Sequence, residues 1–154
     1  ETTPVSVMGR EEIIGSHRSP VTADTLIGKV HPTKEDMLVL PGGMPGTLHL
    51  GDCEGLKGFL MKAAEENGRI AAICAAPTVL GKLGLLNGRK AICYPGMEDG
   101  LAGAEVTVEP VVTDGNITTS RGLGTAIPFA LRLIEELSGK ETADRIAESV
   151  VYQA

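Results

Sequence analysis

One stretch of the sequence, residues 69–82, restricts the fold more than any other, because an apolar run changes there into a helix-forming run at a single cysteine. Ile70–Ile73 has the continuous apolar character of a buried strand, and apolar residues recur at helical spacing across Val79–Leu83. Pro77 suits the first turn of a helix, where its missing N–H costs no hydrogen bond. The pattern therefore predicts a strand-to-helix turn at Cys74.

A cysteine at such a turn is a candidate nucleophile. The turn exposes one side chain at the carboxyl end of the sheet, and the small residues Ala72, Ala75 and Ala76 allow the backbone to bend sharply. N–H groups at the start of the helix favour the thiolate over the thiol. The alternative is a cysteine packed in the core like a small hydrophobic residue. The local pattern alone leaves both interpretations open.

Composition argues against several classes of partner. The 154 residues carry a net charge of −6, only 3% are aromatic, and there is no Trp, so we expect no nucleic-acid partner. No apolar stretch approaches the roughly 18 residues of a membrane span, so we expect no membrane partner. The three cysteines (Cys53, Cys74 and Cys93) are odd in number and lack metal spacing. We therefore expect a cytoplasmic location and no metal site.

Strand and helix patterns alternate along the chain, which predicts a single α/β domain over residues 1–154 with a mainly parallel sheet between helices. Strand patterns occupy Pro4–Met8, a hairpin from Ile13–Ile14 to Val21, Met37–Leu40, Ile70–Ile73, Lys90–Cys93, Val106–Val108, and a second hairpin from Val111–Thr113 to Ile117–Thr119. Helix patterns occupy Leu56–Ala64 with Asp52 as N-cap, the stretch after Pro77, Ala126–Leu137 ended by Gly139, and Glu141–Val150. The unbroken apolar run Met37–Leu40 is typical of a parallel strand covered on both faces.

Three loops are expected to meet at the carboxyl ends of these strands: Pro41–Gly43, Cys74–Ala75 and Tyr94–Pro95. A thiolate that attacks a carbonyl needs donors for the developing oxyanion, and backbone N–H groups of Gly43 and Ala75 are candidates. The alternative for Pro41–Gly43 is an ordinary turn at the end of a strand.

Four motifs in this order resemble the ThiJ/PfpI superfamily, specifically its protein-deglycase branch, which includes the parkinsonism-linked protein. The motifs are Leu40–Gly43, Ala71–Pro77, Cys93–Gly96 and Thr119–Thr125. The resemblance implies a flavodoxin-like, three-layer α/β sandwich with a nucleophile elbow, usually as a homodimer. It also implies that Cys74 is the reactive, easily oxidised cysteine and that Gly43 and Ala75 line its pocket.

The resemblance extends to residues outside the elbow. By its position in the first hairpin, Arg18 is similar to the family's arginine that reaches toward the cysteine pocket of the partner subunit. Ser120 and Arg121 match a motif near the same pocket. Cys53 and Cys93 are expected to be structural.

The sequence also departs from the family pattern at two positions of the site. The superfamily's peptidases have a histidine directly after the cysteine, where this chain has Ala75, so a peptidase of that type is not expected. Deglycase and glyoxalase members have a histidine where this chain has Tyr94, which is a poorer proton shuttle at neutral pH. The three histidines are expected in loops or on the surface: His17, His31 and His49.

The largest departure concerns the amino-terminal unit of the family, a strand and a helix. The start of that helix carries a glutamate hydrogen-bonded to the cysteine, and neither Glu11 nor Glu12 lies at the matching place. A sheet without its first strand would expose two long edges. We expect the strand and helix to come from a separate or cleaved segment, or to be missing from this sequence.

Two functions follow from the resemblance. The first is cysteine-dependent processing of small reactive carbonyls, such as methylglyoxal, or of their glycated adducts, as a cofactor-independent glyoxalase or deglycase in stress protection. The second is a redox-sensing stress protein or chaperone that acts through oxidation of Cys74. Acid–base residues matter less for the second function, so Tyr94 is no objection to it.

Overall fold

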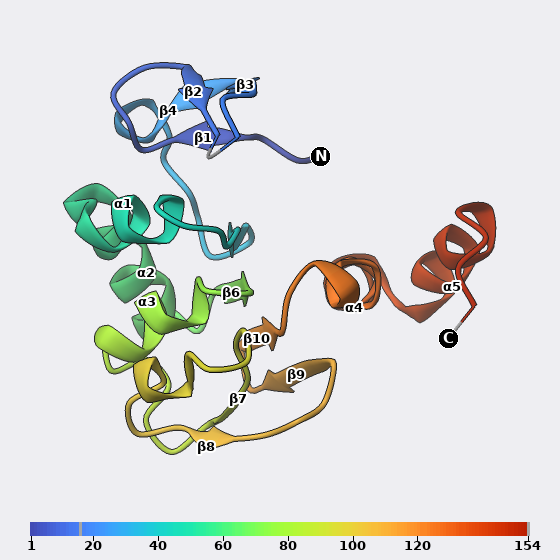
Figure 1. Ribbon diagram of the computed structural model, residues 1–154. Helices are drawn as coiled ribbons and strands as arrows, with labels where there is room; N and C mark the ends of the chain where they lie inside the picture. The colour runs from blue at the N-terminus through green and yellow to red at the C-terminus, as the bar shows by residue number, and fades with distance from the viewer. Residues whose placement is uncertain (16, 154) are drawn as a thin grey trace.

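A four-stranded sheet forms the centre of the fold in the computed structural model, which describes residues 1–15 and 17–153. Its order is β5 (Met37–Leu40), β6 (Arg69–Ile73), β10 (Ile117–Ser120) and β9 (Val111–Asp114). The pairs β5–β6 and β6–β10 are parallel, and β9–β10 is an antiparallel hairpin. The predicted mainly parallel α/β arrangement is therefore confirmed (Figure 1).

One face of this sheet packs against the helices α1 (Gly46–Asp52), α2 (Glu54–Glu65) and α3 (Pro77–Lys82). Its core contains Leu60, Ile70 and Leu80, each no more than 1% exposed. Strand β6 supplies Ile70 and Ala72 to this core, whereas Ala71 faces the other way. The alternation of side chains along a strand explains why one apolar run serves both faces.

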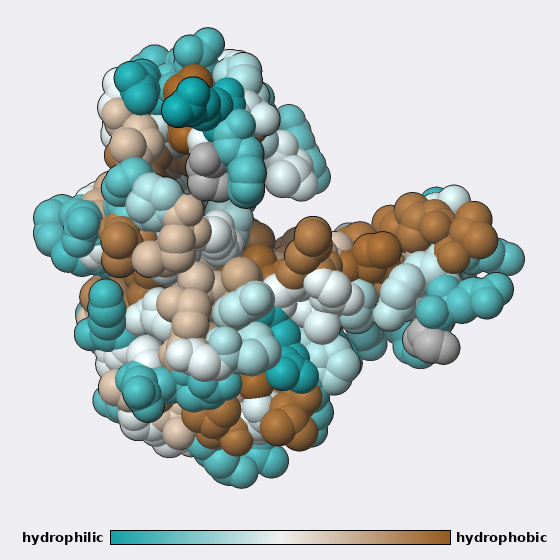
Figure 2. Space-filling model, viewed as in Figure 1, coloured by the Kyte–Doolittle hydropathy of each residue, from teal (hydrophilic) through white to brown (hydrophobic). Residues whose placement is uncertain are grey.

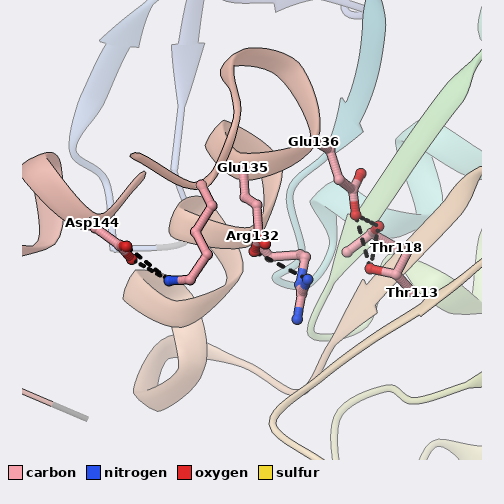
Figure 3. A network of polar contacts seen from close by, with 7 residues as sticks. Thr113, Thr118, Arg132, Glu135, Glu136 and Asp144 are labelled. Atoms are coloured by element: carbon pink, nitrogen blue, oxygen red, sulfur yellow. Dashed lines mark hydrogen bonds and ion pairs between the residues drawn. The ribbon is translucent and has the colours of Figure 1, made fainter. Parts of the chain in front are cut away.

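The other face is covered by α4 (Ala126–Ser138), whose Phe129 and Leu133 pack on Ala71. Glu136 fixes this helix to the sheet, because the hydroxyls of Thr113 and Thr118 each donate to its Oε1 over 2.8 Å (Figure 3). Gly139 (φ +84°) ends α4 as the sequence predicts. Helix α5 (Lys140–Ser149) then packs on α4 and projects away from the sheet (Figure 1).

Residues before β5 form a lobe of short strands. β1 (Val5–Ser6) pairs in parallel with β4 (Thr25–Leu26), and β2 (Glu12–Ile14) with β3 (Pro20–Thr22) makes the predicted hairpin. Ser16, at the expected tip of that hairpin, lies outside the described residues. The lobe contacts the rest of the molecule through the short helix η1 (Ile27–Lys29), which lies against α2.

The segment between α3 and β9 carries β7 (Lys90–Ala91), the short helix η2 (Glu98–Gly100) and β8 (Glu105–Val106). β7 and β8 form a parallel pair. The Ile92 N–H donates to Thr119 Oγ1 over 3.0 Å, so this segment is hydrogen-bonded to the central sheet. The short helix η3 (Leu123–Thr125) links β10 to α4.

Three details of the fold differ from the sequence predictions. Asp52 is not the N-cap of α2, because residues 46–52 form the unpredicted helix α1 and Cys53 stands at the cap position. The strand β7 stops at Ala91 rather than Cys93. Strand β5 is not covered on both faces, since Val39 is 48% exposed and β5 lies at the edge of the sheet. Among residues 1–15 and 17–153, no helix has the length and apolar character needed to cross a membrane.

Candidate active site

Cys74 occupies a strained turn between β6 and α3. Its φ of +65° lies in the left-handed region, which costs a residue with a Cβ roughly 1–2 kcal/mol. Two hydrogen bonds hold this conformation: the Cys74 N–H donates to the Ser120 carbonyl over 3.0 Å, and the Tyr94 N–H donates to the Cys74 carbonyl over 2.8 Å. The turn therefore joins the end of β10 to the loop after β7 and presents a half-buried side chain.

Gly42 determines how closely the turn after β5 approaches the cysteine. A Cβ at this position would lie 2.5 Å from Cys74 Cβ, 2.7 Å from the Ile73 carbonyl oxygen and 3.0 Å from Ala75 N. Any side chain larger than hydrogen would collide with backbone atoms that cannot move independently. Gly42 was not predicted as a site residue, and the paired glycines were the only signal for it; the prediction that Gly43 lines the pocket is untouched by this contact.

Gly122 and Tyr94 flank the thiol on the side of β10. A Cβ at Gly122 would lie 4.0 Å from Cys74 Sγ and 3.4 Å from a ring carbon of Tyr94. The Tyr94 side chain is half exposed, so its ring stands at the rim of the site. Gly122 was part of the quoted motif but was not predicted as a site residue, and the structure places it beside the sulfur.

The other predicted pocket residues hold the surrounding loops. Gly43 (φ +91°) accepts hydrogen bonds at its carbonyl from both the N–H and the hydroxyl of Thr47, each 2.9 Å long. Ala75 is buried, and its carbonyl accepts a 2.7 Å hydrogen bond from the hydroxyl of Thr78. These bonds fix the turns before α1 and α3. Whether Gly43 and Ala75 hold an oxyanion stays a prediction.

Ser120 and Arg121 follow β10 directly and contribute differently. The Ser120 side chain is fully buried, and its hydroxyl bonds the Pro110 carbonyl at 2.8 Å and Thr125 Oγ1 at 2.7 Å. Ser120 therefore acts on the elbow through its carbonyl oxygen. Arg121 is half-buried, and its charge helps to lower the pKa of Glu98, after the larger effect of hydrogen bonds from the backbone N–H groups of Glu98 and Gly96. Arg121 thus lies near the loop that follows Tyr94.

The remaining cysteines differ from Cys74 in their surroundings. Cys93 has no exposed surface, and burial, with smaller contributions from Glu98 and Cys74, raises its pKa to about 11. It is therefore a neutral thiol at physiological pH. Cys53 is half-buried at the start of α2.

Arg18 is not brought to Cys74 within one chain. It lies in the β2–β3 hairpin with φ +60°, and Figure 1 shows this hairpin at the far side of the lobe from β6 and α3. Its expected contact with a partner subunit stays a prediction. His17, His31 and His49 are exposed, in agreement with the expected surface positions.

Hollows occur at both ends of the central sheet. One of about 290 Å³ lies between α1, α3 and η2 and is lined in part by Met44, Val79 and Met97. Met44 and Gly96, from the loops that hold Gly43 and Tyr94, also line it, whereas Cys74 does not. A larger, more open hollow of about 610 Å³ lies near the start of β6, lined in part by Arg69 and Asn116, at the opposite end of this strand from Cys74. The larger hollow is therefore remote from Cys74.

Three relatives share sequence with the chain. Protein dj-1beta of Drosophila melanogaster is 40% identical over 154 residues, which cover 98% of this chain and 82% of dj-1beta. Deglycase PH1704 of Pyrococcus horikoshii is 39% identical over 73% of this chain and 68% of its own length. The glutathione-independent glyoxalase DJR-1.2 of Caenorhabditis elegans is 31% identical over 82% of this chain and 68% of its own length.

A solved structure and a family model agree with these relatives. Oxidized DJ-1 of Toxoplasma gondii superimposes with a TM-score of 0.93 at 37% identity, covering all of this chain and 84% of the solved chain. The flavodoxin-like fold implied by the four motifs is thereby confirmed. The model of the DJ-1/PfpI family matches residues 1–136, which include the elbow and all the loops around it. The chain is therefore a member of the DJ-1/PfpI family.

Proposed function

We propose that the chain processes small reactive carbonyls through Cys74, in the manner of a glyoxalase or deglycase. The observation that carries the proposal is the strained, half-buried Cys74, held open between Gly42, Gly122 and Tyr94. Strain at a residue fixed by its surroundings is a frequent property of catalytic positions. The deglycase and the glyoxalase among the relatives support the choice of substrate class.

With methylglyoxal as substrate, the Cys74 thiolate adds to the aldehyde carbon and forms a hemithioacetal. The aldehyde hydrogen leaves as a proton, and an enediol forms; a proton then returns to the former ketone carbon, which gives a lactate thioester. One water molecule hydrolyses the thioester and releases the hydroxy acid and the thiolate. The aldehyde carbon is oxidised and the ketone carbon reduced by the same number of electrons, so no external redox partner is needed.

The chain's residues would divide the supporting roles. The N–H groups of Gly43 and Ala75 would stabilise the oxyanion, and the Tyr94 hydroxyl at the rim would donate a hydrogen bond to the carbonyl oxygen. The proton transfer needs a base, which the family resemblance places in the amino-terminal strand and helix. Cys93 takes no part, because its raised pKa keeps it protonated.

The test compares three single variants for methylglyoxal consumption and lactate formation, followed by NMR. We expect Cys74→Ser to lose at least about a hundredfold in kcat/KM, since a hydroxyl is a far weaker nucleophile than a thiolate. Cys53→Ser should retain wild-type turnover because Cys53 lies at the start of α2, outside the elbow. Equal loss in both variants would contradict the proposal. Tyr94→Phe should raise KM with a smaller change in kcat.

A second function, redox sensing through Cys74, is favoured by one specific observation: the site has a tyrosine, not a histidine, at its rim. Oxidation to a sulfinic acid needs an accessible thiolate but no proton shuttle. Mild hydrogen peroxide should add about 32 Da, two oxygen atoms, to the Cys74 peptide. Oxidation of Cys53 or Cys93 with Cys74 unmodified would exclude this function.

A further inference from the structure

The outer strand of the β7–β8 pair has a free edge. The N–H groups of Glu105 and Thr107 donate to backbone carbonyls of residues 89–91 over 2.9 and 3.1 Å, which binds β8 to β7. Because N–H groups alternate from side to side along an extended strand, those of Val106 and Val108 face away from β7. Within the part of the chain that the structure describes, β8 pairs with β7 alone. Figure 1 shows β8 at the lower edge of the molecule.

The two valines on this free edge are exposed. Val106 is 44% exposed and Val108 is 83% exposed, whereas the hydroxyl oxygen of Thr107 between them is buried. Alternate residues of an extended segment share a face, so the valines lie side by side. Figure 2 shows hydrophobic side chains on the lower surface, where Figure 1 places β8. The edge therefore offers backbone hydrogen-bonding groups together with apolar contacts, the combination by which a sheet edge takes up an extended peptide.

The exposed segment is held in place at both ends. Before it, the Gly88 N–H donates to the Gly103 carbonyl over 2.8 Å, and after it, the buried hydroxyl of Ser120 donates to the Pro110 carbonyl over 2.8 Å. The Ile92 N–H ties the end of β7 to the central sheet. A segment fixed in this way loses little further conformational freedom when a partner strand pairs with it, which favours binding.

Glutamates flank the valines and bear on the choice of partner. Glu105 and Glu109 are exposed, and neither takes part in an ion pair within the described chain. With a second copy, the antiparallel register that uses both outward-facing residues sets Val106 opposite Val108, and this register also sets Glu105 opposite Glu109. Like charges directly opposite each other on paired strands are destabilising. The same two positions favour a partner strand with lysine or arginine there.

We propose that residues 105–109, the acidic edge, are a docking site for an extended segment of a partner protein. This segment carries β-branched residues at alternate positions, and lysine or arginine where it faces Glu105 and Glu109. It adds to β8 as a further strand: backbone hydrogen bonds to Val106 and Val108 supply affinity, and the glutamates select for a basic sequence. Docking at the acidic edge does not use the thiol of Cys74.

The test compares two peptides of five residues, each extended by one glycine at both ends and blocked at both termini. The acidic peptide copies residues 105–109, and the basic peptide has lysine in place of both glutamates. Because this segment reads the same in both directions, the lysines face the glutamates in parallel and antiparallel pairing alike. Binding is followed through the backbone amide NMR signals of the isotope-labelled chain. We expect the basic peptide to shift the amides of Val106 and Val108, to bind at least about tenfold more tightly than the acidic one, and to weaken with salt.

Charge reversal supplies the matched control. Glu105→Lys combined with Glu109→Lys should reverse the preference, so that the acidic peptide binds more tightly. Glu141→Lys combined with Glu148→Lys changes the net charge equally at exposed positions of α5, and this variant should bind as the wild type does. Cys74→Ser should also bind normally, so a failure of the carbonyl chemistry and a failure of docking are distinguishable. Circular dichroism establishes that each variant is folded, and the comparison of the two peptides on the wild type needs no variant.

Four outcomes would overturn the proposal. The first is no shift of the amides of residues 105–109 at about 2 mM basic peptide. The second is equal affinity of the wild type for the two peptides. The third is an unchanged preference in the charge-reversed variant of the acidic edge. The fourth is a dimer of the free chain that this variant dissociates, which would make a second copy the occupant.

Discussion

The two faces of the central sheet are packed to very different extents. Toward α1, α2 and α3, the core includes buried residues from two helices, α2 and α3, and from three of the sheet strands, among them Leu60, Leu80 and Ile117. Toward α4, the buried cluster is Ala71, Phe129 and Leu133. Helix α3, which directly follows the turn at Cys74, packs on the first face through Val79 and Leu80. The elbow is therefore attached to the well-packed face. On the second face, over β5, Val39 is 48% exposed.

The largest expected difference between the faces concerns apolar truncation. Leu60→Ala removes a side chain with no exposed surface and should lower the free energy of unfolding by about 2–5 kcal/mol. Leu137→Ala, on the half-exposed flank of α4, should change it by no more than about 0.5 kcal/mol. Urea titrations followed by circular dichroism measure both. Comparable losses would show that the second face is covered in the free chain.

Backbone contact at the elbow can be tested next. Gly42→Ala inserts a Cβ against Ile73 and Ala75 backbone atoms, so we expect a loss of about 2–3 kcal/mol and slower alkylation of Cys74 by iodoacetamide. Gly58→Ala, in the middle of α2 with no atom near its Cβ position, should instead stabilise by up to about 1 kcal/mol. A Gly42→Ala protein with wild-type stability and labelling rate would contradict the close approach.

The pH dependence of stability reports burial on the well-packed face. Burial raises the pKa of Cys93 to about 11 in the folded chain, above the ordinary value of a free thiol, so the folded state holds its proton more tightly. Its contribution is complete below pH 9 and is lost as the pH rises toward 11. Between pH 8 and pH 10, the free energy of unfolding should fall by about 1 kcal/mol more in the wild type than in Cys93→Ala. Identical slopes in the two proteins would mean that Cys93 is accessible to solvent.

The smallest effect concerns how α4 is attached. Glu136→Gln weakens two hydrogen bonds from Thr113 and Thr118, which should cost about 1 kcal/mol and loosen α4 on the sheet. Glu135→Gln removes an exposed ion pair with Arg132 on the same helix and should cost less than about 0.5 kcal/mol. Thermal unfolding of the two variants compares them directly. An equal effect would assign α4 docking to Phe129 and Leu133 alone.

Local pattern was enough to predict much of the fold. Hydrophobic periodicity and glycine positions act over a few residues, so a local pattern can predict short elements and their ends. It predicted the elbow at Cys74, the β2–β3 and β9–β10 hairpins, and the helices α4 and α5 on either side of Gly139. Helix α1 was missed since Gly46–Asp52 has two glycines and no clear apolar stripe. Its position depends on contacts with α2 and α3, which no local pattern contains.

For the candidate site, the sequence by itself determined the turn at Cys74 and the three loops around it. The tertiary structure decided which atoms meet: Gly42 packs closely on the elbow, Gly122 lies beside the sulfur, and Ser120 contributes its carbonyl instead of its hydroxyl. Likewise, an apolar run such as Met37–Leu40 indicates a strand, but not its place in the sheet. Strand order depends on pairing between residues far apart in the chain, so the exposure of Val39 was visible only in three dimensions.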